Sequence, residues 1–460
     1  MMHMHELYDN QGRTERAVLV GLKLARHDDE IWQMAFTELK GLVETAGAEV
    51  VTELIQNRDL PDPATYIGKG KLAELNAVIG ELNIDVVVFD SELSPKHVRN
   101  LENALSCRVL DRTQVILDIF AMRAKTREGK LQVELAQLHY LMPRLTGQGA
   151  AMSRLGGGIG TRGPGETKLE TDRRHIRGRI LELSRQLDEV RKHRDLHKKR
   201  RKKQEIPVIA FVGYTNAGKS TLMKAIVERY GNGNREVAEG RNRLFDTLDT
   251  TTRQVQLPDG KTAIFSDTVG FIQQLPHSLI RAFRSTLEET AEADLIVHVV
   301  DASHPGFDVQ MATVYDVLQE LKVLDRPILT VFNKIDLVPG AWIGNDPNST
   351  ETVRVSATLG DGLDTLMEKA NDLAGVRHLL VTVEVPYKEA ALTAQVHREG
   401  RIFEEEHRES GTYLKAEVPQ RLADELSVYF LQEAEEVVPP KEVKKLYFDF
   451  TTPESDDVLH

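Results

Sequence analysis

The sequence predicts a multidomain α/β protein. Its 460 residues are too many for one ordinary hydrophobic core, and roughly two to four domains are expected at that length. Strand-like and helix-like stretches alternate in two separate regions, which is typical of parallel sheets covered by helices. The region between them has heptad-spaced apolar residues, which predict paired helices. We therefore expect an α/β domain over 1–112, a helical hairpin over 113–205 and a second α/β domain over 206–376.

The composition is that of a soluble globular protein, with 41% hydrophobic and 28% charged residues. No apolar run approaches the roughly 18 residues that span a bilayer, and residues 1–18 lack the pattern of an export signal. We therefore expect a cytoplasmic protein without an integral membrane partner. The single cysteine, Cys107, excludes an intramolecular disulfide and a multi-cysteine metal site. It precedes an apolar run, which favours a buried, unreactive side chain.

The net charge of −12 is spread unevenly along the chain. Residues 170–205 contain 14 Lys and Arg against 7 Asp and Glu, including the unbroken basic run 198–203. Residues 378–460 contain 18 Asp and Glu against 9 Lys and Arg. Each domain therefore presents its own electric field to partners, and the basic stretch keeps nucleic acid among the candidates.

The first region alternates between strands and helices, as a small parallel α/β domain requires. An amphipathic helix is expected over 28–45 because its apolar residues recur at three- and four-residue spacings. The other expected elements are strands at 17–24, 50–55, 85–90 and 108–111, and helices beginning near Lys71 and after Ser94-Pro95. The sequence Gly-Lys-Gly-Lys at 68–71 suits either a phosphate at a helix N-terminus or an ordinary turn, and we favour the turn.

Two apolar stripes at heptad-like spacing predict an antiparallel helical hairpin, because each stripe can bury the other. The first stripe is Leu131, Leu135 and Leu138, and the second is Leu169, Ile176, Ile180, Leu183, Leu187 and Val190. Eight glycines between Thr146 and Thr167 separate the two helices. This glycine-rich segment is either a mobile linker or a tip that allows close approach to another surface. Its nearby charges are Arg144, Arg154 and Arg162.

A phosphate-binding loop opens the second α/β region. The apolar strand 208–212 runs into GYTNAGKS, which matches G-x-x-x-x-G-K-[ST], and a helix-like stretch follows. Glycines let backbone N–H groups turn toward phosphates, a lysine reaches the β- and γ-phosphates, and a hydroxyl binds Mg²⁺. The expected phosphate-binding residues are Gly213, Tyr214, Thr215, Asn216, Ala217, Gly218, Lys219, Ser220 and Thr221.

Three further motifs follow in the order of a guanine nucleotide site. DTVG begins at Asp267, which would hold Mg²⁺, and ends at Gly270, whose N–H would meet the γ-phosphate. NKID covers 333–336, and Ser356-Ala357 follows a short strand. The motifs start 54, 66 and 23 residues apart in chain order. Four motifs in this order indicate GTP binding far more strongly than any one of them alone.

The choice of base depends on NKID. The Asp336 carboxylate can accept hydrogen bonds from both guanine N1–H and the exocyclic amine, a pair of donors that adenine lacks. Asn333 suits the N7/O6 edge, the Lys334 stem can pack over the ring, and Ser356 and Ala357 can offer backbone N–H groups to O6.

The predicted reaction is in-line attack of water on the γ-phosphate. A switch segment must offer a threonine to Mg²⁺, and the candidates Thr247, Thr250, Thr251 and Thr252 cannot be ranked by spacing.

Phe271 follows DTVG and cannot orient the attacking water. We therefore expect slow intrinsic hydrolysis that a partner accelerates; an alternative is a binding module that holds GTP without turnover. Asn216 could ligate K⁺, or it could be a loop asparagine bonded to its own backbone.

Long stretches of the sequence resemble the HflX family. The matching segments are YIGKGKLAEL, VVVFDSELSP, KLQVELAQL, GGGIGTRGPGETKLETDRR, GYTNAGKSTL, LFDTLDTTTR, DTVGFIQQLPH and NKID. The resemblance implies an N-terminal α/β domain, a helical hairpin, a Ras-like GTPase domain with its P-loop, and a small C-terminal α+β domain over 377–460 with an acidic tail. It also places the Mg²⁺-binding threonine at Thr247, which joins Lys219 and Gly270 as the expected catalytic groups.

The same resemblance implies a function on the ribosome. A protein of this family would act as a monomer that binds GTP, GDP and Mg²⁺. In its GTP state it would bind the large ribosomal subunit and its RNA through the N-terminal domain and the hairpin tip. It would split stalled ribosomes into subunits, and ribosome-stimulated hydrolysis would time its release. A secondary ATPase activity is also implied. The alternative is a GTP-dependent factor that remodels or modifies free RNA.

Overall fold

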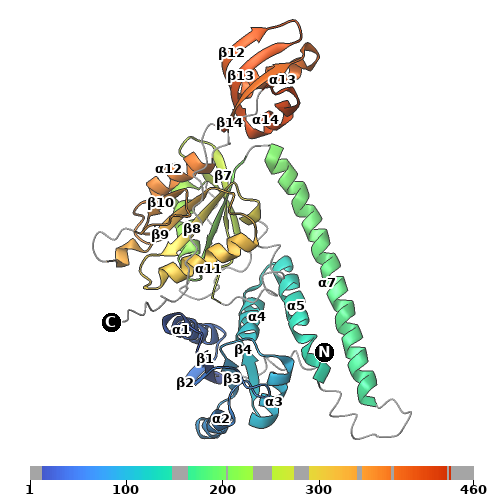
Figure 1. The fold of residues 1–460 in the computed structure, drawn as a ribbon, viewed down its shortest axis with the longest axis vertical. Coiled ribbons are helices and arrows are strands. Elements are labelled where there is room, and N and C mark those ends of the chain that lie inside the picture. Colours follow the sequence, from blue (N-terminus) through green and yellow to red (C-terminus); the bar gives the residue numbers. More distant parts are fainter. Residues whose placement is uncertain are drawn as a thin grey trace, which may run out of the picture.

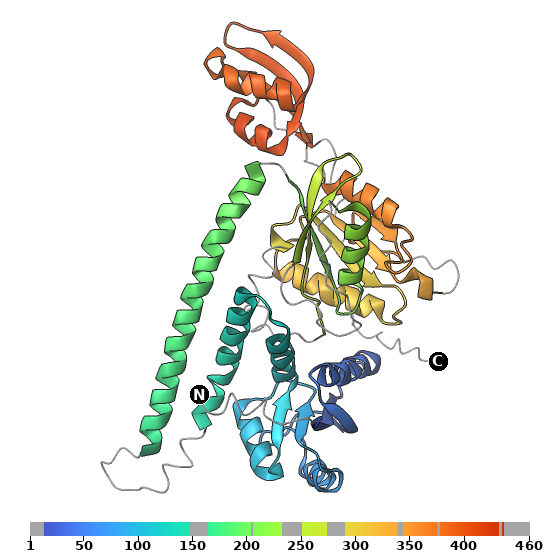
Figure 2. The ribbon, with the colours of Figure 1, turned by 180° about the vertical axis from the view of Figure 1, so that it is seen from behind.

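The computed structural model describes residues 13–147, 164–203, 206–231, 251–273, 290–338, 344–374, 378–431 and 435–436. Within them the chain forms three separate sheets, each with its own helices (Figure 1). The first and second sheets belong to α/β units that are neighbours in space, and the third sheet lies at the far end of the molecule in both views (Figures 1 and 2).

The first unit is a parallel sheet in the order β2-β1-β3-β4. The central strands β1 and β3 are buried on both faces, so odd and even positions of β1 face different helices. Ala17 and Leu19 pack against α1 and α4, whereas Val18 and Val20 pack against α2 and α3. The elements are β1 (Arg16–Leu24), α1 (Asp29–Thr45), β2 (Glu49–Arg58), α2 (Lys69–Leu82), β3 (Val86–Phe89), α3 (Pro95–Leu105), β4 (Arg108–Asp111) and α4 (Arg112–Arg123).

These elements match the strands and helices expected from the alternation in the sequence. Helix α1 begins after Asp28, whose side chain accepts hydrogen bonds from the N–H groups of Glu30 and Ile31. At the start of α2, the Gly68 N–H donates to Gln56 Oε1 at 2.9 Å, so a side chain already occupies this backbone donor. Helix α4 packs on the first sheet. The domain boundary expected from the sequence, between residues 112 and 113, had placed this helix in the hairpin.

The hairpin consists of α5 (Arg127–Leu141) and the 40-residue helix α7 (Pro164–Lys203). The first predicted stripe and four residues of the second meet in one apolar cluster: Leu131, Leu135 and Leu138 contact Ile176, Ile180, Leu183 and Leu187. The Arg179 guanidinium also bonds both oxygens of Glu134, at 2.7 and 2.8 Å. Helix α7 runs alongside both α/β units (Figures 1 and 2).

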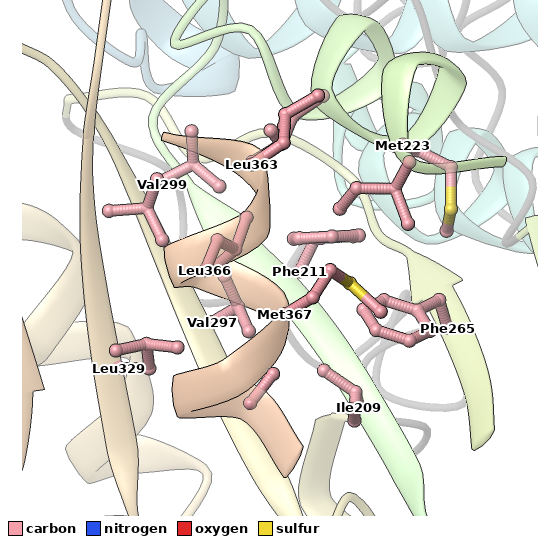
Figure 3. Packing of buried hydrophobic residues seen from close by; sticks show 14 of the residues in the cluster. Ile209, Phe211, Met223, Phe265, Val297, Val299, Leu329, Leu363, Leu366 and Met367 are labelled. Carbon is pink, nitrogen blue, oxygen red and sulfur yellow. The ribbon is translucent and has the colours of Figure 1, made fainter. Parts of the chain in front are cut away.

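The second unit is a six-stranded sheet in the order β10-β9-β8-β5-β7-β6, parallel except for β6. Helices α8 and α12 cover one face and α11 covers the other. Figure 3 shows Leu366 and Met367 of α12 packed over Phe211 and Val297. The elements are β5 (Val208–Gly213), α8 (Lys219–Tyr230), β6 (Thr251–Gln256), β7 (Thr262–Asp267), β8 (Leu295–Asp301), α11 (Phe307–Glu320), β9 (Ile328–Asn333), β10 (Glu351–Arg354) and α12 (Leu363–Ala374).

The third unit has the element order βαββαβ and an antiparallel sheet in the order β12-β13-β11-β14. This is a ferredoxin-like topology. Its helices bury Val383, Leu414 and Leu422 against one face. The elements are β11 (His378–Val385), α13 (Ala390–Glu399), β12 (Arg401–His407), β13 (Thr412–Pro419), α14 (Gln420–Leu426) and β14 (Glu435–Glu436). Among the described residues of the whole chain, no helix is both long enough and apolar enough to cross a membrane.

Candidate functional site

The phosphate loop lies between β5 and α8, and two of its glycines are required by their neighbours. Gly213 has φ +151°, and a side chain there would overlap the backbone of Val299 in β8. Gly218 has φ +95°, and a side chain there would overlap the amide of Asn333. Only glycine accepts both the positive φ and the close approach. The loop therefore packs directly against the strand and the motif that would hold the base.

The Lys219 side chain lies inside the phosphate loop and bonds to its backbone. Its ammonium donates to the carbonyl oxygens of Gly213 at 3.0 Å and Tyr214 at 2.8 Å, and the residue is buried. Burial lowers the pKa of Lys219 to about 8, although the carboxylate of Asp267 works against this shift. A buried ammonium with little negative charge around it favours the binding of the negatively charged phosphates of a nucleotide.

The two described residues that were expected to bind Mg²⁺ lie side by side. Ser220 Oγ donates to Asp267 Oδ2 at 2.8 Å, so a hydroxyl and a carboxylate meet at the start of α8 and the end of β7. Such oxygen donors suit Mg²⁺, which is usually held by few protein ligands together with substrate phosphates. Thr247 and Thr250 lie outside the described residues. Thr251 and Thr252 begin β6, and Thr251 is paired with Asp267.

Gly270 lies against the phosphate loop. A side chain at this position would come within 2.8 Å of Thr215 Cγ2 and 3.0 Å of Lys219 Nζ. The next residue extends the contact, because Phe271 N donates to Gly213 O at 3.1 Å and Thr215 N donates to Phe271 O at 2.7 Å. The Phe271 ring itself is buried in the core of the second unit, so it presents nothing to a nucleotide.

The base-recognition motif is built at the end of β9. The Asn333 amide donates to Ala217 O at 2.9 Å, and its oxygen accepts from Ala357 N at 3.1 Å. Asn333 therefore links the phosphate loop to the Ser356-Ala357 turn. From its motif, Asn333 was expected to bind the N7/O6 edge of guanine instead. Lys334 has φ +65°, and its ammonium lies 2.6 Å from Asp301 Oδ2.

Asp336 is exposed in the short 3₁₀ turn Ile335–Leu337. Its side chain is thus accessible to a ligand. The Ser356 N–H donates to Asp361 O at 3.0 Å, which shapes the turn that follows β10. Asp301, which belongs to none of the sequence motifs, ends an apolar strand of the parallel sheet, at the edge where ligand-binding residues gather.

The first unit reaches the phosphate loop through two residues that the sequence analysis also missed, Glu38 and Arg112. The Tyr214 hydroxyl donates to Glu38 Oε1 at 2.7 Å and accepts from Gln273 N at 2.8 Å. Arg112 pairs with the other oxygen of Glu38 and donates to Gln273 O at 3.1 Å. Burial raises the pKa of Glu38, opposed by Arg112, and burial next to Glu38 raises the pKa of Tyr214. The tyrosine hydroxyl therefore stays protonated and acts as the donor.

A cleft of about 660 Å³ lies beside these contacts, between α1 and the phosphate loop. Its lining includes Gln33 and Thr37 from α1 and Thr215, Asn216 and His304 from the second unit. Asn216 adopts φ +62°, a conformation that asparagine tolerates better than most residues. The cleft thus borders the Tyr214–Asn216 part of the phosphate loop.

The fold and the site define a P-loop GTPase with additional N-terminal domains. Residues 33–121 match the family described as GTP-binding GTPase N-terminal, residues 123–201 its middle region, and residues 208–334 the family described as 50S ribosome-binding GTPase. GTPase HflX of Lacrimispora saccharolytica is 47% identical over 419 residues, which cover 91% of this chain and 97% of the relative. GTPase HflX of Escherichia coli K12 is 39% identical and covers 88% of this chain and 94% of its own length. The chain belongs to the HflX family of GTPases.

Proposed function

We propose that this chain binds the large ribosomal subunit in its GTP state and splits stalled ribosomes into subunits. Ribosome-stimulated hydrolysis of GTP then times its release. The observation that carries the proposal is the phosphate loop in which Ser220 bonds to Asp267 and Gly270 lies close to Lys219, within a segment described as a 50S ribosome-binding GTPase.

The residues of this site divide the chemistry between them. Lys219 neutralises charge on the β- and γ-phosphates, and the backbone N–H groups of the loop bind phosphate oxygens. Gly270 offers its N–H to the γ-phosphate, and Asp336 selects guanine. Ser220, Asp267 and Thr247 would hold Mg²⁺, which supplies further neutralisation of the phosphate charge when bound.

Slow hydrolysis without a partner follows from Phe271. Its ring is buried, and so the position that follows DTVG supplies no group to orient the attacking water. A ribosome that orders the switch segments would supply the missing orientation. Single-turnover hydrolysis with and without large subunits tests this: an isolated protein that is as fast as the stimulated one contradicts it.

Binding to ribosomal RNA is supported by the hairpin. The described part of α7 exposes Arg174 and Arg177, and the basic run 198–203 lies at the end of the same helix. Cations on an exposed helix bind phosphate backbones with an affinity that falls as salt is raised. The α7 end next to the glycine-rich segment would enter the large subunit together with the N-terminal unit.

The decisive experiment is sedimentation of ribosomes with the protein and a non-hydrolysable GTP analogue. We expect 70S particles to separate into subunits and the protein to travel with the large subunit. The Lys219→Ala variant should lose both effects. Intact ribosomes without bound protein would refute the proposal, and stimulation of hydrolysis by protein-free RNA alone would favour the RNA-remodelling alternative.

Three finer points belong to the same proposal. The protein is a monomer, which light scattering tests. Asn216 ligates K⁺ beside the phosphates, so turnover in potassium should exceed turnover in sodium. Phosphate release with ATP in place of GTP tests the secondary ATPase activity that the family resemblance implied.

A further inference from the structure

Four polar groups form a closed hydrogen-bonded ring between the first unit and the nucleotide site. Tyr214 comes from the phosphate loop, Gln273 from the segment after DTVG, and Glu38 and Arg112 from α1 and α4. Both backbone groups of Gln273 take part, one bonded to the tyrosine hydroxyl and the other to the arginine. Arg112, Tyr214 and Gln273 are buried and the Glu38 side chain is only 10% exposed, so water has limited access to these bonds.

Apolar contacts strengthen the same connection. Val269 and Ile272 lie in the hydrophobic core of the first unit, together with Ile116 and Phe120 of α4. Phe271, between them, lies in the core of the second unit. The segment 269–273 is therefore anchored alternately in two different domains.

Gly270 lies inside this anchored segment. It touches the phosphate loop at Thr215 and lies close to the ammonium of Lys219. Any shift of the first unit relative to the second must therefore move Gly270, or break the contacts of Val269, Ile272 and Gln273. Conversely, if a γ-phosphate forms a hydrogen bond with the Gly270 N–H and shifts Gly270, the bonds of the ring are strained.

We propose that Glu38 and Arg112 are positioning residues of the nucleotide site, supplied by the N-terminal domain. Acting through Tyr214 and Gln273, they hold Gly270 where its N–H can meet a γ-phosphate, and they thereby couple the preference for GTP over GDP to the docking of that domain. This inference rests on the proposed GTPase function of the site. It adds the route by which the N-terminal domain senses the bound nucleotide.

The test is the ratio of the affinities for a non-hydrolysable GTP analogue and for GDP, measured with fluorescent nucleotides on the isolated full-length protein. Glu38→Gln keeps the size of the side chain and removes its charge, so the pair with Arg112 is lost. We expect this variant to bind the analogue more weakly and GDP as before. The ratio should fall at least about fivefold, the lower end of typical coupling between sites.

Two further variants separate positioning from general damage. Tyr214→Phe removes the hydroxyl and should lower the ratio by a similar factor. The double variant should be no worse than either single one, because both break the same ring. The matched control is Glu134→Gln, which breaks the Arg179 ion pair of the hairpin in the same chemical way. It should leave the ratio unchanged.

Hydrogen exchange of residues 267–273 supplies a readout independent of affinity. The GTP analogue should protect this segment in the wild type and protect it less in Glu38→Gln. Should the glutamine variant fail to fold, Tyr214→Phe decides. An unchanged ratio, equal weakening of both nucleotides, or the same loss in Glu134→Gln would overturn the inference. Wild-type protein that binds neither nucleotide would overturn the proposed function as well, whereas failure on ribosomes alone would leave this inference standing.

Discussion

Phe271 and Ile272 are adjacent in the chain, yet they are buried in the cores of different domains. The peptide bond between them lies on the boundary of the two units, and Gly270 directly precedes Phe271. The residue that would sense the γ-phosphate is thus tied to the packing of both domains.

Replacing Ile272 with alanine should therefore affect both stability and nucleotide binding. The side chain is fully buried, and truncating such an isoleucine costs about 2–5 kcal/mol. Urea unfolding measures the loss, and titration with a GTP analogue should show weaker binding. The control is Leu337→Ala, which removes an exposed apolar side chain and should change stability little. Full stability in Ile272→Ala would contradict the packing described here.

Gly218→Ala should abolish nucleotide binding. The new methyl group would overlap the Asn333 amide, and the positive φ is unfavourable for alanine. Gly260→Ala is a matched control, because Gly260 has φ +85° with no neighbour within 4 Å. It should suffer only the backbone strain and still bind GTP. Calorimetric titration of both variants checks the prediction, and similar binding by the two would rule out the steric explanation.

Asp336→Asn should change the base that the protein accepts. An asparagine can accept from N1–H and donate to an oxygen at position 2, which matches xanthine and leaves the guanine amine without an acceptor. Hydrogen bonds to charged groups contribute about 1.5–3 kcal/mol each, so GTP affinity should fall at least about tenfold. Competition between GTP and XTP measures the change. A variant that keeps its preference for GTP would remove Asp336 from the site.

The buried carboxyl of Asp118 on α4 should make its contribution to the free energy of unfolding decrease as the pH rises. Burial raises its pKa from 3.8 to about 6, so between these values the folded state holds the proton more tightly than the unfolded state. The contribution of Asp118 to stability therefore falls as pH rises from about 4 to 6. Asp118→Asn keeps the acceptor for Gln114 Nε2 and removes the charge. The variant should be more stable than the wild type at pH 7.5 and lose this advantage near pH 4, as urea unfolding at both pH values would show.

Much of the fold could be predicted from local patterns. Strands buried on both faces read as continuous apolar runs, and heptad spacing brought the stripes of α5 and α7 together. Helix α4 was harder to place. Its apolar residues suit packing on a sheet as well as on another helix, and only the tertiary structure shows that it covers the first sheet.

Some residues of the candidate site could likewise be predicted from the sequence, and others could not. The phosphate-loop motif around Lys219 and the DTVG motif at Asp267 could be found in the sequence because each is a short and characteristic pattern. The bond between Glu38 and Tyr214 joins residues 176 positions apart, and no local pattern predicts such a pair. The amide of Asn333 shows a similar limit, since a motif names the residue without revealing that it bridges two loops.

The length of α7 determines how far the hairpin tip lies from the GTPase domain. A straight helix rises about 1.5 Å per residue, so its 40 residues extend for about 60 Å, and only four residues separate its end from β5, which leads into the phosphate loop. Because the phosphate loop follows the other end of β5, the C-terminal end of α7 is fixed at the edge of the GTPase sheet opposite the nucleotide site. Deleting one heptad would retract the far end by about 10 Å while keeping the apolar stripe in phase.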